Sequence, residues 1–159
     1  MPHDESKPDD SPSDPRLVRA EYATRLAGLK GRLAARATRP LSLAFIGVGE
    51  VSDGIRLGVP VAGLNALGNP AMVARSLSSL DLDRYDAFVF ARPQIAANGL
   101  RDMQQIRRLG KRVVVDLDDD FYAIPPDHPG YGGVGPGNPG RMQALEAALA
   151  LADVVVVAT

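Results

Sequence analysis

Short runs of apolar residues alternate with segments in which apolar residues recur every three or four positions. The short runs predict β-strands buried on both faces, because such strands have no polar face to alternate with. The longer segments predict helices, since that spacing places the apolar residues on one side of a helix. Strands are predicted at 41–48, 71–74, 86–91, 113–115 and 152–159, and helices at 59–67, 96–109 and from 138 onward. This alternation predicts an α/β domain over 41–159, a Rossmann-like open parallel sheet of about five strands with helices on both faces.

The pattern before residue 40 is different. Residues 1–14 contain Asp, Ser, Pro and Lys with almost no apolar side chains, so we expect a disordered tail. Residues 15–38 predict an N-terminal amphipathic helix. Its basic face, over residues 16–36, favours either exposure to water or peripheral contact with a membrane surface or a partner protein. Its apolar stripe consists of Val18, Tyr22, Leu26, Leu29 and Leu33.

The composition excludes several classes of site. The 159 residues include no cysteine and two histidines, which excludes disulfides and thiolate metal sites and leaves little for histidine-based zinc binding. The formal net charge of -1 gives no reason to expect a nucleic-acid partner. No apolar run approaches the ~20 residues that a membrane-spanning helix needs. Because the acidic, Pro-rich N-terminus is also not a signal peptide, we expect a cytoplasmic protein.

Four aspartates follow the apolar run Val113–Val115 within five positions. They are Asp116, Asp118, Asp119 and Asp120. An unpaired charge inside a core is too costly, so these carboxylates are expected where the strand emerges from the sheet. In an open α/β sheet, ligands bind at the carboxyl ends of the strands. Arg92 follows another predicted strand, so it is expected at the same edge.

Glycines follow the first predicted strand. Gly47 and Gly49 begin a pattern similar to a dinucleotide-binding turn, but Ser52 stands where the third glycine of that pattern belongs. We therefore predict a flexible loop that runs through Asp53, Gly54 and Arg56 to the helix at 59–67. Backbone N–H groups of glycines in such a loop are suited to bind phosphate.

Three segments together resemble a known family. They are 85–93 (YDAFVFARP), 110–121 (GKRVVVDLDDDF) and 148–159 (ALALADVVVVAT). They are similar to the N-terminal domain of GT-B glycosyltransferases, in particular family 4-like bacterial enzymes that act on surface polysaccharides. The resemblance covers residues 41–159. It implies an acceptor-side Rossmann-like domain, whose partner would be a C-terminal domain that binds a nucleotide-sugar and is absent from this sequence. It also implies sugar transfer to a glycan acceptor in the cleft between the domains, without a metal or another cofactor.

The resemblance also implies roles for individual residues. Asp118 and Asp119 would be catalytic and would position the acceptor hydroxyl, where many relatives place a His-Asp pair; this chain has no histidine there. The loop 47–56 would approach the donor phosphates, and Arg92 would neutralise or orient charge. The other substrate-binding residues implied are Gly47, Gly49, Asp53, Gly54, Arg56, Asp116 and Asp120.

A phosphatase is the main alternative. An apolar strand followed by Asp116 and Asp118 also fits the haloacid dehalogenase-like phosphatases, in which Asp116 would be the nucleophile and Asp118 the general acid/base. The segment 154–159, a strand that ends in Thr, resembles their second motif. Against this hypothesis, at least three predicted strands precede the aspartates, whereas that motif usually lies near the start of the domain.

Two further hypotheses remain. Carboxylates at this density suit Mg²⁺ or Mn²⁺, although the strand–helix order does not match the glycosyltransferase fold that uses Asp-x-Asp for metal. The domain can also be a non-catalytic Rossmann-like binding module. In that case each aspartate caps a turn or pairs with an arginine such as Arg92, Arg101 or Arg141.

Overall fold

Five parallel strands form one sheet, in the order β2-β1-β3-β4-β5. The computed structural model describes residues 39–49 and 53–157, so the predicted tail at 1–14 and the predicted helix at 15–38 lie outside the described residues. The strands are β1 (Leu43–Ile46), β2 (Ala71–Ala74), β3 (Ala87–Ala91), β4 (Arg112–Leu117) and β5 (Val154–Val157). The helices are α2 (Asp53–Arg56), α3 (Gly58–Ala66), α4 (Gly99–Arg108) and α5 (Pro139–Leu151), with 3₁₀ turns η1 (Leu77–Ser79) and η2 (Leu82–Arg84).

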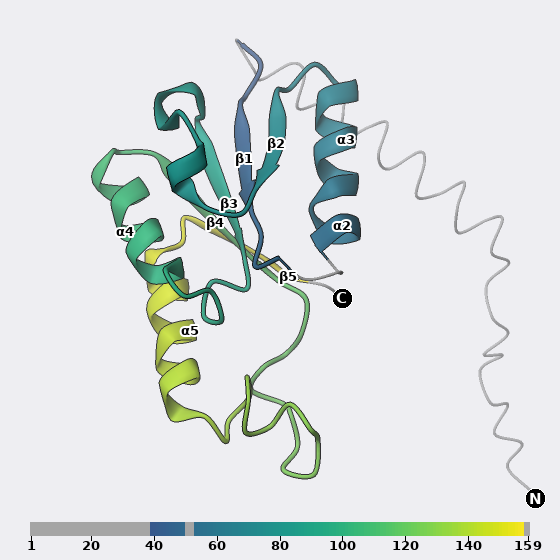
Figure 1. Ribbon diagram of the computed structural model, residues 1–159, viewed down its shortest axis with the longest axis vertical. Helices are drawn as coiled ribbons and strands as arrows, with labels where there is room; N and C mark the ends of the chain where they lie inside the picture. Colours follow the sequence, from purple (N-terminus) through teal and green to yellow (C-terminus); the bar gives the residue numbers. More distant parts are fainter. Residues whose placement is uncertain (1–38, 50–52, 158–159) are drawn as a thin grey trace, which may run out of the picture. The chain divides into compact units, whose positions relative to one another are not determined.

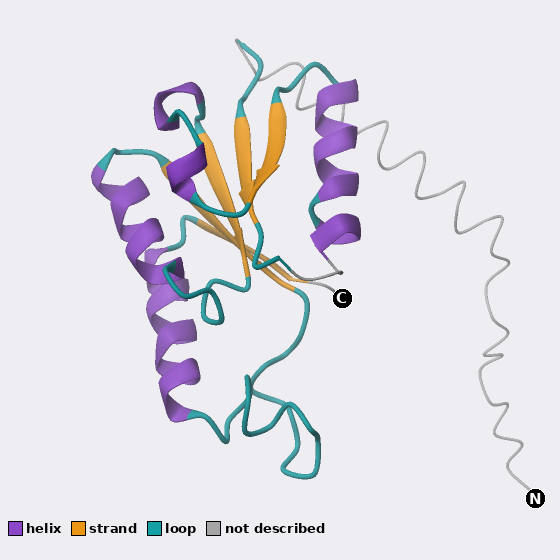
Figure 2. Cartoon of the chain, viewed as in Figure 1, coloured by secondary structure: helices purple, strands orange, loops and turns teal. Residues whose placement is uncertain are grey.

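Helices cover both faces of the sheet, as predicted. Figures 1 and 2 show α3 on one side of the sheet and α4 and α5 on the other. Side chains alternate between the two faces along each strand. Phe88 and Phe90 of β3 pack with α4 and α5, whereas Val89 packs with Leu57 and the apolar side chains of α3. The prediction of a Rossmann-like parallel α/β fold is therefore confirmed.

The strand order creates a crevice between β1 and β3. The chain leaves β1 toward α3 on one face and leaves β3 toward α4 on the other face. Where neighbouring strands send their connections to opposite faces, a crevice opens at the carboxyl edge of the sheet, and ligands of open α/β sheets bind there. The polar residues that follow β1, β3 and β4 are therefore placed around one location.

The boundaries of several elements differ from the predictions. The segment predicted as a flexible loop up to residue 58 contains the helical turn α2, and the buried side chain of Leu57 anchors it. The helix predicted from 96 begins at Gly99, because the residues before it form turns. Gly99 itself lies under the Pro93 carbonyl, where an added Cβ would come within 2.1 Å of the oxygen.

The last strand was predicted to be buried, and that prediction is wrong. The four valines of β5 are 42–60% exposed. β5 is an edge strand that pairs with β4 alone. Among the described residues, no valine of β5 belongs to either apolar core, whereas α3 lies over the β1 and β2 end of the sheet. A run of valines predicts a strand, but its burial depends on elements that lie elsewhere in the chain.

Membrane-spanning structure was not expected from the sequence. In the part of the chain that the structure describes, every helix is too short or too polar to cross a bilayer. Even α5 has 13 residues, fewer than the ~20 that a bilayer requires.

Candidate functional site

The four aspartates do not lie together, because β4 ends at Leu117 and the chain turns after it. Asp116 lies within β4 and Asp118 directly after it, and both side chains reach the side of the sheet that carries α2 and α3. Leu117, between them, packs into the core formed with α4 and α5. Asp116 and Asp118 meet Asp53, Arg56 and Arg92 there, and we call these five side chains the acid–arginine cluster.

Arg56 donates hydrogen bonds to both carboxylate oxygens of Asp116. The Arg56 Nη2 donates to Asp116 Oδ1 at 2.8 Å, and Nε donates to Oδ2 at 3.3 Å. Both oxygens of the carboxylate therefore accept from one guanidinium, an arrangement that fixes the orientation of both groups. The side chains are 13% and 23% exposed, so water screens this pair less than it screens a surface pair. Asp116 thus positions Arg56 under the end of β4.

One carboxylate oxygen of Asp118 can accept a further hydrogen bond. Its Oδ2 lies 3.7 Å from Arg56 Nε and 3.6 Å from Arg92 Nε. Its Oδ1 is buried and has no hydrogen-bond partner among the described residues. A buried polar atom of this kind usually has a partner in water or a ligand. Asp118 is therefore the member of the cluster that is suited to accept a hydrogen bond from a bound molecule.

Arg92 reaches the cluster through an unusual backbone conformation. It follows β3 with φ at 45°, in the left-handed region that non-glycine residues rarely adopt. Its backbone N–H donates to the Asp116 carbonyl at 3.1 Å, which extends the pairing of β3 with β4 by one bond. The guanidinium then lies between Asp118 and Asp53, 3.9 Å from Asp53 Oδ1.

The glycine turn after β1 supports Asp53. The Gly49 N–H donates to Asp53 Oδ2 at 2.7 Å. Gly47 lies so close that an added Cβ would come within 2.5 Å of the same oxygen, so a larger residue there would displace Asp53. The Gly47 N–H donates to the Ala74 carbonyl at 3.0 Å. Both amides predicted to approach phosphate are thus already engaged, and Gly54 is exposed on α2.

Asp119 and Asp120 lie outside the acid–arginine cluster. The Asp120 carboxylate accepts from the backbone N–H groups of Tyr122 and Ala123, at 3.1 and 3.3 Å, and so caps the turn after β4. Asp119 is exposed. Of the predicted site residues, the structure brings Gly47, Gly49, Asp53, Arg56, Arg92, Asp116 and Asp118 together.

A polar groove lies beside the crevice between β1 and β3. It consists of two adjoining cavities of about 240 and 220 Å³ that share Ser76, Asn98 and Asp102. Burial raises the pKa of the Asp102 carboxyl, and the Arg101 guanidinium lowers it by a smaller amount. The other polar side chains that line the groove are Arg75, Ser78, Arg101 and Gln105. Hydroxyl, amide, guanidinium and carboxylate groups are the partners that a polyhydroxylated ligand requires.

Sequence reasoning missed the polar groove. Its polar side chains come from the segment after β2 and from the start of α4, which lie twenty or more positions apart in the chain. Asn98 does precede a helix, which would suggest a cap, but its side chain makes no capping hydrogen bond. The sequence contains no pattern that indicates that these two segments meet.

The metal hypothesis gains no support from the geometry. Within residues 39–49 and 53–157, no group of three or more His, Cys, Asp or Glu side chains is arranged to hold a metal ion.

Comparisons with protein-family models, curated proteins and solved structures find no match. Function is therefore inferred from the residues and their arrangement.

Proposed function

We propose that residues 41–159 are the acceptor-side, N-terminal domain of a GT-B glycosyltransferase. Its reaction would transfer a sugar from a nucleotide-sugar to a glycan or another surface-polysaccharide acceptor, in the cytoplasm. One observation carries the proposal. Asp118 presents a buried carboxylate oxygen without a described partner at the carboxyl edge of the sheet, where ligands of α/β proteins bind.

The cluster suggests a role for each of its members. Asp118 Oδ1 would accept a hydrogen bond from the acceptor hydroxyl and increase the nucleophilicity of that oxygen. Arg56 and Arg92, each within 4.0 Å of Asp118 Oδ2, would hold the carboxylate in position. Asp116 and Asp53 would hold the two guanidiniums in place. The glycine turn, whose Gly49 amide binds Asp53, would act through Asp53.

The polar groove supports an acceptor that contains more than one sugar. It adjoins Gly47 and Pro93 at the end of β1 and β3, so it lies at the same edge of the sheet as Asp118. Ser76, Asn98 and Asp102 would bind hydroxyl groups of the glycan. Donor binding would require the second domain that the resemblance implies.

The phosphatase hypothesis fits the geometry less well. A nucleophilic carboxylate needs an oxygen that can reach phosphorus. Both oxygens of Asp116 accept hydrogen bonds from Arg56, so this residue would first have to leave its partner. Asp118 in turn lies between two arginines.

Asp118→Asn tests the proposal in the full-length protein. We expect the rate of nucleotide release from a panel of nucleotide-sugars, with a glycan acceptor present, to fall about 100-fold or more, because the hydrogen-bond acceptor loses its charge. The double variant Asp118→Asn/Asp119→Asn should lose little more, since Asp119 lies outside the cluster. Asp83→Asn, an exposed aspartate in η2, is the control.

The same proteins separate the alternatives. Wild-type turnover in Asp118→Asn would reject the site. Hydrolysis of p-nitrophenyl phosphate with Mg²⁺ that is lost in Asp116→Asn would replace our proposal with the phosphatase. Glycan binding without turnover of any donor would favour a non-catalytic binding module.

A further inference from the structure

Gln94 carries a buried carboxamide in the turn that follows β3. The residue is 3% exposed, and within residues 39–49 and 53–157 neither its side-chain oxygen nor its side-chain nitrogen has a hydrogen-bond partner. A carboxamide offers one acceptor oxygen and two N–H donors. Because buried polar groups are nearly always hydrogen-bonded, the partner of this carboxamide is expected to be a molecule other than the protein.

The backbone of this turn is held from two helices. The Gln94 carbonyl accepts from Arg141 Nη1, in the first turn of α5, at 2.6 Å. The carbonyl of Pro93 lies against Gly99 at the start of α4, where an added Cβ would come within 2.1 Å of its oxygen. The Gln94 side chain can therefore change partners by rotation while its backbone stays in place.

The same turn connects the two parts of the candidate site. Arg92 precedes it and belongs to the acid–arginine cluster, with its Nε 3.6 Å from Asp118 Oδ2. Pro93 and Ala96 line the polar groove. Gln94 thus lies in the chain between a residue of the cluster and a residue of the groove. A molecule that extends from the groove to Asp118 would pass this turn.

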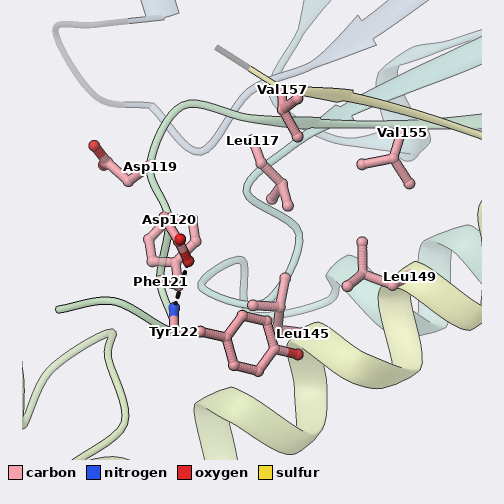
Figure 3. A pocket seen from close by; sticks show the side chains of 9 residues that line it. All are labelled: Leu117, Asp119, Asp120, Phe121, Tyr122, Leu145, Leu149, Val155 and Val157. Carbon is pink, nitrogen blue, oxygen red and sulfur yellow. Dashed lines mark hydrogen bonds between the residues drawn. The ribbon is translucent and has the colours of Figure 1, made fainter. Parts of the chain in front are cut away.

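A larger cavity between α5, β5 and the turn after β4 lacks such a group. Its volume is about 420 Å³. In Figure 3, Asp119 points away from this cavity and Asp120 accepts from the Tyr122 N–H. None of the residues that line it has a buried side-chain N or O atom without a hydrogen-bond partner. A ligand rich in hydroxyl groups would therefore find a buried polar partner at the end of β3 and not in this cavity.

We propose that Gln94 is a hydroxyl-binding residue of the acceptor site, an inference that rests on the proposed function. Burial without a partner costs free energy, because the carboxamide has given up its hydrogen bonds to water. When a glycan enters the polar groove, the side chain would rotate toward it. One hydroxyl of a sugar ring would then donate to the amide oxygen, and the neighbouring hydroxyl would accept from the amide N–H. The substrate class is therefore a glycan with two free adjacent hydroxyls.

Gln94→Met tests whether the carboxamide is unpaired in the free protein. Methionine has a similar length without polar atoms and leaves the backbone bond to Arg141 in place. Removal of an unpaired buried amide should raise Tm, followed by circular dichroism, by about 2–5 °C. Gln104→Met makes the same change at an exposed position of α4 and should leave Tm unchanged. If Tm of Gln94→Met is at or below that of the wild type, the amide has a permanent partner such as a buried water, and the proposal is wrong.

The side-chain amide signals of the ¹⁵N-labelled full chain report the contact directly. The signals of Gln94 and Gln104 are assigned by their loss from the two methionine variants. The probes are maltotriose, cellotriose and chitotriose. We expect at least one of them to shift the Gln94 signal and to leave the Gln104 signal in place. Gln94→Met should bind that trisaccharide about tenfold more weakly, because two hydrogen bonds between neutral groups are lost.

Two further results would overturn the proposal. They are the absence of saturable binding of all three trisaccharides, and equal affinity of the wild type and Gln94→Met. Neither result decides the glycosyltransferase proposal, which is tested by nucleotide release through Asp118. Wild-type turnover in Asp118→Asn together with a shifted Gln94 signal would reject the sugar-transfer site and retain Gln94 as a glycan-binding residue.

Discussion

At the scale of single residues, Arg92 has a backbone conformation that lowers the stability of the fold at the candidate site. A non-glycine residue at positive φ brings its Cβ close to the following carbonyl, which costs roughly 1–2 kcal/mol. The surrounding structure holds Arg92 there through its backbone bond to Asp116 and its position between Asp53 and Asp118. Strain of this kind concentrates at functional sites, where neighbouring interactions determine the backbone conformation.

Two substitutions separate the strain from the charge at this position. Arg92→Gly and Arg92→Ala both remove the guanidinium, but only alanine retains a Cβ at φ 45°. We expect Arg92→Gly to be more stable than Arg92→Ala by about 0.5–1 kcal/mol, after the greater unfolded-state entropy of glycine is included. Urea denaturation monitored by circular dichroism gives the difference. If alanine is as stable as glycine, the left-handed conformation of Arg92 is not present in solution.

At the scale of elements, Asp153 connects three parts of the fold just before β5. Its Oδ2 accepts from the Val113 N–H at 2.8 Å, and its own N–H donates to the Val113 carbonyl at 2.8 Å. Its Oδ1 accepts from Arg107 in the last turn of α4. The hydrogen bond from the Val113 backbone, followed by the one from Arg107, holds the pKa of the Asp153 carboxyl below its ordinary value of 3.8.

Asp153→Asn should therefore change how stability depends on pH. Because the folded-state pKa is lowered, the carboxylate stabilises the fold at pH values above its unfolded-state pKa, and this contribution disappears as the pH falls through the folded-state pKa. Asparagine can still accept from Val113, so the loss at pH 7 should be modest, about 1 kcal/mol. Urea denaturation at several pH values should show the wild type and the variant converging below about pH 4.

The exposed Asp127 supplies the control for this pH series. Asp127→Asn should follow the wild type at every pH. A difference between wild type and Asp153→Asn that stays constant down to pH 3 would mean that the charge of Asp153 does not contribute to stability.

At this scale, some features of the fold could be predicted from the sequence and others could not. The strand at 71–74 has the predicted bounds because Gly68, at φ 79°, ends α3 and Pro70 precedes the strand, so local signals mark where it begins. The aspartates after β4 were expected at the carboxyl edge because a buried charge is too costly. The pairing of Arg56 with Asp116 joins residues 60 positions apart, and no local pattern records such a contact. The separation of Asp119 and Asp120 from the acid–arginine cluster likewise depends on where the strand ends.

At the scale of the whole domain, the interior strand β4 is buried much more completely than the edge strand β5. Val115 of β4 is fully buried, whereas its neighbour in register, Val155 of β5, is 42% exposed. Both residues are valines in adjacent parallel strands and both face α5, so composition and secondary structure are the same. The difference arises because β4 has a strand on each side and helices above it, while β5 has a neighbour on one side only.

Truncation of these two valines tests that description of the domain. Val115→Ala leaves a cavity in a closed core and should cost about 2–3 kcal/mol of unfolding free energy. Val155→Ala removes the same atoms from a partly exposed position, where water can fill the space, and should cost under about 1 kcal/mol. Urea denaturation of both variants in the full chain provides the comparison. Equal losses would mean that another segment or another molecule covers β5 in solution.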